Sequence, residues 1–84
     1  MTDNQGQTEI RLRVGPYSGG QVAVHFEPTG MIYELLEGDW LEVTMRGSSL
    51  GLIEIGHTPE AVIVGSWPDA EVVVRASDGT ELEI

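Results

Sequence analysis

The sequence contains no cysteine and no lysine, and each absence limits what the chain can be. Without cysteine, neither a disulfide nor a thiolate zinc site can stabilise the fold. A domain of 84 residues buries only about 60% of the surface that its unfolded chain exposes, so its stability is marginal without such help. A homodimer that shares a core is one remaining way to stabilise it.

Basic residues are scarce. Four arginines stand against 14 carboxylates, and the net charge is −10. Because this charge repels phosphate backbones and anionic lipid surfaces, we expect neither nucleic-acid binding nor membrane binding. Basic proteins and cations are the partners that the field would attract. A second interpretation stays open: the acidity only keeps the protein soluble, or reflects a salt-adapted or GC-rich source.

Long apolar runs are also missing. No stretch approaches the ~20 apolar residues that a membrane-spanning helix needs. Residues 1–7, MTDNQGQ, lack the basic and apolar regions of a signal peptide and are expected to form a disordered tail. We therefore predict a cytoplasmic protein with a single β domain over residues 8–84.

The feature that the sequence does contain is an alternation of apolar and polar residues with a period of two. Ile10, Leu12 and Val14 alternate with charged residues, and similar short segments recur between glycine-rich breaks. This pattern predicts an all-β fold, a small antiparallel β-sandwich or barrel of seven to eight short strands. Thr58 could cap a helix, but β-branched residues follow, so we expect at most one helical turn near 58–62.

The closing segment, residues 71–84, predicts a hairpin with the three-residue loop Ser77-Asp78-Gly79. This register pairs Val74 with Leu82, Val72 with Ile84 and Arg75 with Glu81, which keeps the apolar pairs on one face. It requires a positive φ at the last loop residue, where glycine stands.

A second hairpin is predicted over residues 31–45, with a loop at 37–39. One face would be wholly apolar, and the reverse face would combine Ile32, Leu36 and Trp40 with a like-charge pair, Glu34 and Glu42. In a sandwich that reverse face is exposed unless a partner or a second copy covers it.

Tryptophan is enriched at binding hot spots, although it is also often partly buried in small cores. The candidate partner-binding residues are therefore Trp40, Trp67, Ile32, Leu36 and Glu42.

A cation site is a further hypothesis. His25 and Glu27 lie two residues apart on one strand and share a face, which Glu34 could approach from the next strand. The candidate metal ligands are thus His25, Glu27 and Glu34. The arrangement has a faint likeness to the metal-binding strands of cupins, but the second histidine and the glutamate spacing of that family are missing. No cofactor is expected otherwise.

Residues 47–51, GSSLG, match the nucleophile-elbow pattern with Ser49 as the nucleophile. That chemistry needs a strand-to-helix turn on a large parallel sheet, followed by an acid and then a histidine. Here His57 precedes Asp69 and the chain is too short for that fold. We therefore expect no enzyme.

The leading hypothesis is a non-enzymatic acidic domain that engages a basic protein through an apolar patch rimmed by carboxylates. It resembles immunity proteins, antitoxins and anti-defence proteins in charge and size alone. The alternatives are a homodimeric structural β domain and a small cupin-like binder of a cation or small molecule.

Overall fold

A computed structural model describes residues 8–16, 18–49 and 51–83, and within them the chain forms eight strands and no helix. The strands are β1 (Thr8–Val14), β2 (Val22–Glu27), β3 (Met31–Leu35), β4 (Leu41–Gly47), β5 (Glu54–His57), β6 (Ala61–Gly65), β7 (Glu71–Ala76) and β8 (Glu81–Leu82). The all-β prediction is confirmed. In the described part of the chain there is consequently no helix long and apolar enough to cross a bilayer. The predicted tail, 1–7, lies outside these residues.

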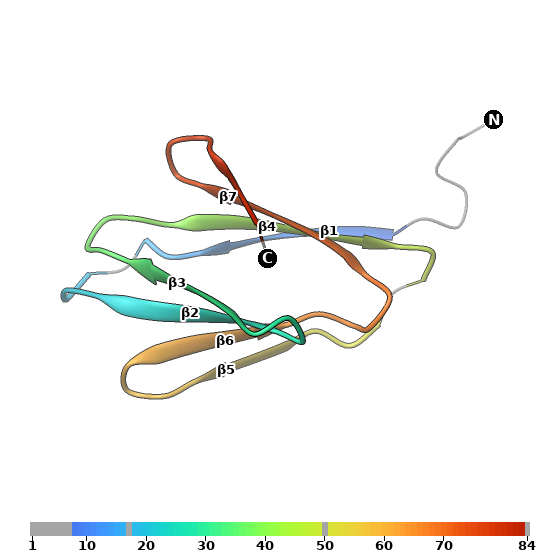
Figure 1. The fold of residues 1–84 in the computed structure, drawn as a ribbon, viewed down its shortest axis with the longest axis horizontal. Coiled ribbons are helices and arrows are strands. Elements are labelled where there is room, and N and C mark those ends of the chain that lie inside the picture. Colours follow the sequence, from blue (N-terminus) through green and yellow to red (C-terminus); the bar gives the residue numbers. More distant parts are fainter. Residues whose placement is uncertain (1–7, 17, 50, 84) are drawn as a thin grey trace.

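The strands form two sheets of four, in the orders β1-β4-β7-β8 and β3-β2-β6-β5, and Figure 1 shows them as two layers. The fold is thus a small β-sandwich. All but one of the strand pairs are antiparallel, and β2 with β6 is the parallel exception to the antiparallel prediction. Between β2 and β6 the chain crosses to the other sheet to form β4 and then returns as the β5-β6 hairpin. This path brings β6 beside β2 in the same direction.

The core is filled by the inward residues of both sheets, as the alternation predicts. Val24, Val43 and Val74 are fully buried, and they lie on the central strands β2, β4 and β7. Phe26 meets Tyr33 edge to face, with ring centroids 6.2 Å apart and planes inclined by 69°. Because alternate residues point inward, every strand presents its intervening side chains on an outer face.

The closing hairpin has the predicted register. Val74 pairs with Leu82 and Arg75 with Glu81. Gly79 has φ +93°, and its amide donates to the Ala76 carbonyl over 2.9 Å, which closes the turn. The predicted partner of Val72, Ile84, lies outside the described residues.

The second predicted hairpin is wrong, because β3 and β4 belong to different sheets. Tyr33 pairs with Val24 on β2, whereas Val43 lies between Leu12 on β1 and Val74 on β7. Residues 36–40 cross from one layer to the other, so Glu34 and Glu42 are not a cross-strand pair. Two apolar faces can meet across a sandwich interior as readily as side by side, and the alternation alone does not distinguish these arrangements.

The helical turn allowed near 58–62 does not form. Thr58 Oγ1 accepts a hydrogen bond from the Glu60 amide over 3.2 Å, as a helix cap would. However, the Thr58 amide donates to the Ala61 carbonyl over 2.8 Å, and the segment is a tight connection between β5 and β6. The β-branched residues after it continue as a strand.

Candidate functional site

The two outer faces of the sandwich differ sharply in charge. The outer face of β1, β4, β7 and β8 holds all four arginines of the chain, Arg11, Arg13, Arg46 and Arg75. We call it the arginine face. It also holds four glutamates, Glu9, Glu42, Glu71 and Glu81, so its formal charges cancel. Subtracting these four from the 14 carboxylates leaves ten elsewhere, which equals the whole net charge of −10.

Two of the four arginines on the arginine face, Arg46 and Arg75, form ion pairs. Arg46 lies between Glu9 and Glu71, at 3.8 Å and 3.3 Å from their carboxylate oxygens. Arg75 lies 3.9 Å from Glu81. These side chains are well exposed, so each pair contributes only about 0–1 kcal/mol. The neutrality of the face therefore comes from its equal numbers of arginines and glutamates, and only part of these charges form ion pairs among the described residues.

The outer face of β3, β2, β6 and β5 is built differently, and we call it the acidic face. A row across its middle consists of Ile32, His25, Ile63 and Gly56, which are neighbours in the strand register. Ile32 is 53% exposed. Exposed glutamates flank this row: Glu27, Glu34 and Glu54.

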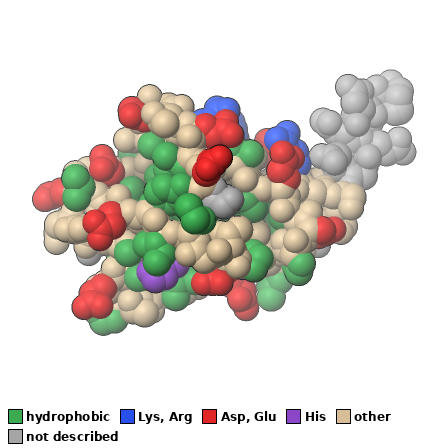
Figure 2. All heavy atoms as spheres, viewed as in Figure 1, with side chains coloured by type: hydrophobic (Ala, Val, Ile, Leu, Met, Phe, Trp, Pro, Cys, Tyr) green, Lys and Arg blue, Asp and Glu red, His purple; other side chains and the backbone are tan. Residues whose placement is uncertain are grey.

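No arginine stands on the acidic face among the described residues, since all four lie on the opposite sheet. Figure 2 agrees: the basic side chains in view gather over the β1-β4-β7 sheet, and the lower layer shows apolar and acidic groups. Glu34 Oε1 accepts a hydrogen bond from Gln21 Nε2 over 2.7 Å. The acidic face therefore combines an apolar strip, Ile32 and Ile63 with His25 between them, with glutamates that have no arginine nearby.

A shallow groove of about 370 Å³ runs over one end of the acidic face. Its lining residues are Glu27, Glu54, Ile55, Gly56, Ile63 and Gly65. Gly65 lies between Glu27 on β2 and Glu54 on β5 in the register, so the groove has a bare backbone floor between two carboxylate side chains. Ile55 on the edge strand is 60% exposed and adds apolar surface at the rim.

The predicted partner-binding residues do not form one surface. Ile32 is on the acidic face, and Leu36, which directly follows β3, is 58% exposed. Trp40 and Glu42 lie with the arginine face: Arg13 stacks over the Trp40 ring at 4.1 Å, and Glu42 stands between Arg13 and Arg75 in the register. The error follows from the wrong hairpin, which placed these residues on one sheet.

Trp67 belongs to the core, the alternative that the sequence left open, and is 4% exposed. Two glycines make room for it: a Cβ on Gly51 would lie 2.2 Å from the Trp67 Cβ, and one on Gly47 would lie 3.1 Å from Nε1. Nε1 has no hydrogen-bond partner within the described part of the chain. The glycines of the GSSLG pattern therefore cradle a tryptophan ring, a role that sequence analysis missed.

The candidate metal ligands share a face, as predicted, but they do not converge. His25 pairs with Ile32 on one side and with Ile63 on the other, and Glu34 pairs with Ala23. In residues 8–16, 18–49 and 51–83 no three His, Asp or Glu side chains are grouped closely enough to hold a metal ion.

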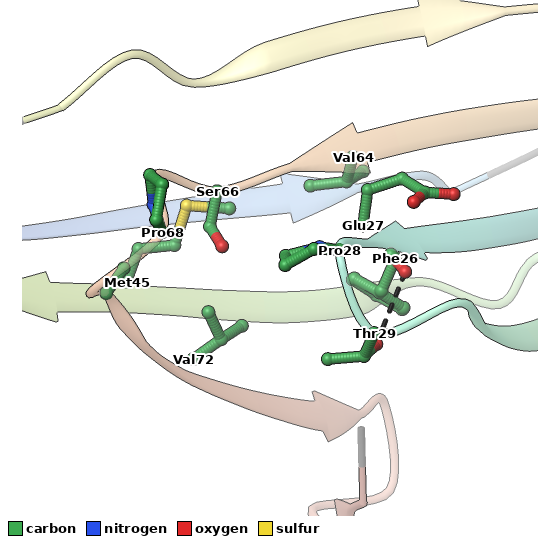
Figure 3. Close-up of a pocket in the computed structure, with 10 residues that line it drawn as sticks. Phe26, Glu27, Pro28, Thr29, Met45, Val64, Ser66, Pro68 and Val72 are labelled. Atoms are coloured by element: carbon green, nitrogen blue, oxygen red, sulfur yellow. Dashed lines mark hydrogen bonds between the residues drawn. The ribbon is translucent and has the colours of Figure 1, made fainter.

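A second pocket, of about 240 Å³, lies at the end of the sandwich between the two sheets (Figure 3). Phe26, Met45 and Val64 form its nearly buried floor. Thr29 Oγ1 donates a hydrogen bond to the Phe26 carbonyl over 3.3 Å. The Glu27 carboxylate points away from Met45 and Val72 (Figure 3). The pocket thus offers mainly apolar contact.

Searches of protein-family models, of curated proteins and of solved structures find no match to this chain.

Proposed function

We propose that this chain is a non-enzymatic protein-binding domain whose acidic face binds a basic segment of another protein. The observation on which this depends is the separation of charge. The arginine face is neutral, whereas Glu27, Glu34 and Glu54 surround an exposed apolar strip without a cation of their own. An apolar patch with a charged rim is typical of a protein interface, in which the strip supplies burial and the rim selects the partner.

Ile32 and Ile63 are the apolar centre of this proposed interface, and Leu36 extends it beyond β3. They lie on or beside the strands that also present the glutamates. A basic partner would neutralise carboxylates that repel one another in the free protein. Association should therefore be fast and strongly weakened by salt.

The test is capture of partners from the cells that produce the protein, using three forms of the full chain. Ile32→Glu places a carboxylate in the apolar strip, and Val73→Glu adds the same charge to the arginine face. We expect the wild type and Val73→Glu to retain one basic protein that Ile32→Glu loses. If all three forms retain the same proteins, the acidic face is not the binding surface and the proposal is wrong.

A homodimer through the acidic face is the second candidate, favoured by the exposure of Ile32 and Leu36. A two-fold axis there would bring the glutamates of both copies together with no arginine between them. We expect such a dimer to require high salt. Sedimentation velocity across a range of protein and salt concentrations checks this, and a stable dimer at low salt would favour the homodimer instead.

A further inference from the structure

We infer that the groove over Gly65 accepts an arginine side chain of the partner, with its guanidinium held between Glu27 and Glu54. The inference depends on the proposed function and specifies the residue that the partner would insert.

Gly65 has a glutamate side chain on each side, Glu27 on β2 and Glu54 on β5. A Cβ built on Gly65 would lie 3.9 Å from the Glu27 Cβ and 3.6 Å from the Glu54 Cβ. The two side chains therefore rise on either side of one bare residue. A guanidinium is planar and presents donors along two edges, so it can bind a carboxylate on each side at once. A lysine ammonium is a compact point charge and would satisfy this geometry less well.

The fold does not require glycine at the positions of Gly56 and Gly65. Neither has a positive φ. An added Cβ would meet its nearest neighbours at 3.9 Å for Gly56 and 3.6 Å for Gly65, which is ordinary contact. Glycine inside a strand costs about 0.5–1 kcal/mol relative to alanine. It often marks a place where another group approaches the backbone closely.

Glu27 and Glu54 form no ion pair among the described residues. Every ion pair among the described residues lies on the arginine face, so Glu27 and Glu54 have no counter-charge from the chain. Ile63 lies beside the two glutamates and can pack against the methylene stem of an arginine. A metal ion is a poor alternative occupant, because no third carboxylate or histidine of the described chain joins the pair.

The first experiment titrates the full ¹⁵N-labelled chain with acetyl-Gly-Arg-Gly-amide and with its lysine and citrulline analogues. Citrulline has the shape of arginine without its charge. We expect the arginine peptide to shift the amide signals of Gly56 and Gly65 most, the lysine peptide to bind at least threefold more weakly, and the citrulline peptide to leave both signals in place. Absence of shifts at these glycines, or equal shifts with citrulline, would overturn the inference.

The second experiment repeats the arginine titration on four variants. Gly65→Ala and Gly65→Val fill the floor progressively without changing charge, and Glu27→Gln removes one wall. Glu60→Gln is the matched control, since it removes the same charge from the exposed β5-β6 connection outside the groove. We expect at least a threefold loss of affinity for Glu27→Gln and Gly65→Val, a smaller loss for Gly65→Ala, and less than a twofold change for Glu60→Gln. Equal losses for Glu27→Gln and Glu60→Gln would indicate diffuse attraction and contradict a specific groove.

The two proposals fail separately. A captured basic protein that binds Gly65→Val as well as wild type but loses Ile32→Glu would disprove the arginine groove and leave the proposed function standing. Capture that is insensitive to Ile32→Glu would disprove the proposed function whatever the peptides show.

Discussion

The arginine face and the acidic face use the same strand alternation but treat their charges in opposite ways. On the arginine face, two rows of the register mix signs, Glu9-Arg46-Glu71 and Arg13-Glu42-Arg75-Glu81. On the acidic face, Glu27 and Glu54 flank a glycine and meet no cation among the described residues. The net charge is therefore unevenly distributed over the molecule.

The difference bears on what each face contributes to the stability of the fold. Cross-strand pairs of opposite charge stabilise a sheet slightly, whereas like charges repel. The arginine face thus contributes to the fold, while the acidic face costs the fold some repulsion that a bound cation would relieve. Substitutions that are matched between the two faces, or between the outside and the core, can test this interpretation.

The largest effect is expected from Gly51→Ala, compared with Gly65→Ala on the acidic face. A Cβ on Gly51 would overlap the Trp67 side chain, whereas one on Gly65 would make ordinary contacts. Overpacking a core costs about 1–3 kcal/mol, and exposed substitutions usually cost less than about 0.5 kcal/mol. Urea denaturation measures both. Equal destabilisation by the two variants would show that Trp67 does not depend on Gly51.

A smaller effect is expected from neutralising one charge on each face. Arg46→Met removes the cation between Glu9 and Glu71 and should lower the free energy of unfolding by up to about 1 kcal/mol at low salt. Glu27→Gln on the acidic face should be neutral or slightly stabilising, because it reduces repulsion. Urea denaturation at low and high salt checks both variants, and the difference should shrink as salt rises. A larger loss for Glu27→Gln would reverse our interpretation of the faces.

The sequence was sufficient to predict which residues are buried on most strands. Val24, Val43 and Val74 follow the alternation into the core, and Gly79 has the positive φ that its hairpin register requires. Both features are local, because a period of two and a turn residue depend on neighbours along the chain.

Sequence analysis failed where the fold is decided by contacts distant along the chain. The alternation in residues 31–45 suits either a hairpin or two strands in opposite sheets, and the structure has the latter. This choice separates Trp40 from Ile32 and therefore divides the predicted binding surface. The Trp67 cradle and the groove at Gly65 were missed for the same reason, since each joins segments that only the strand order brings together.

A further prediction concerns the contact between Arg13 and Trp40 on the arginine face. Arg13→Met should destabilise the protein by about 0.5 kcal/mol, because a cation over a partly exposed ring contributes about 0.5–1 kcal/mol. Arg11→Met is the matched control: it removes the same charge from the same strand, where the paired residue is Thr44. The Trp40 indole signal in an NMR spectrum should move with the first substitution more than with the second. Equal changes would mean that the stacked geometry contributes nothing beyond charge.

The smallest effect is expected at Asp78, in the turn that joins β7 to the edge strand β8. The amide of Thr80 donates to Asp78 Oδ1 over 2.9 Å, and this hydrogen bond lowers the pKa of the carboxyl below its ordinary value of 3.8. Because the pKa is lower in the folded state, the charged form favours folding above pH 3.8, and that contribution disappears as the pH falls through the folded pKa. Asp78→Ala should therefore destabilise the protein slightly at neutral pH and less in acid. An NMR titration of the carboxyl carbon measures the pKa directly, and a value at or above 3.8 would show that the turn does not stabilise the charged form.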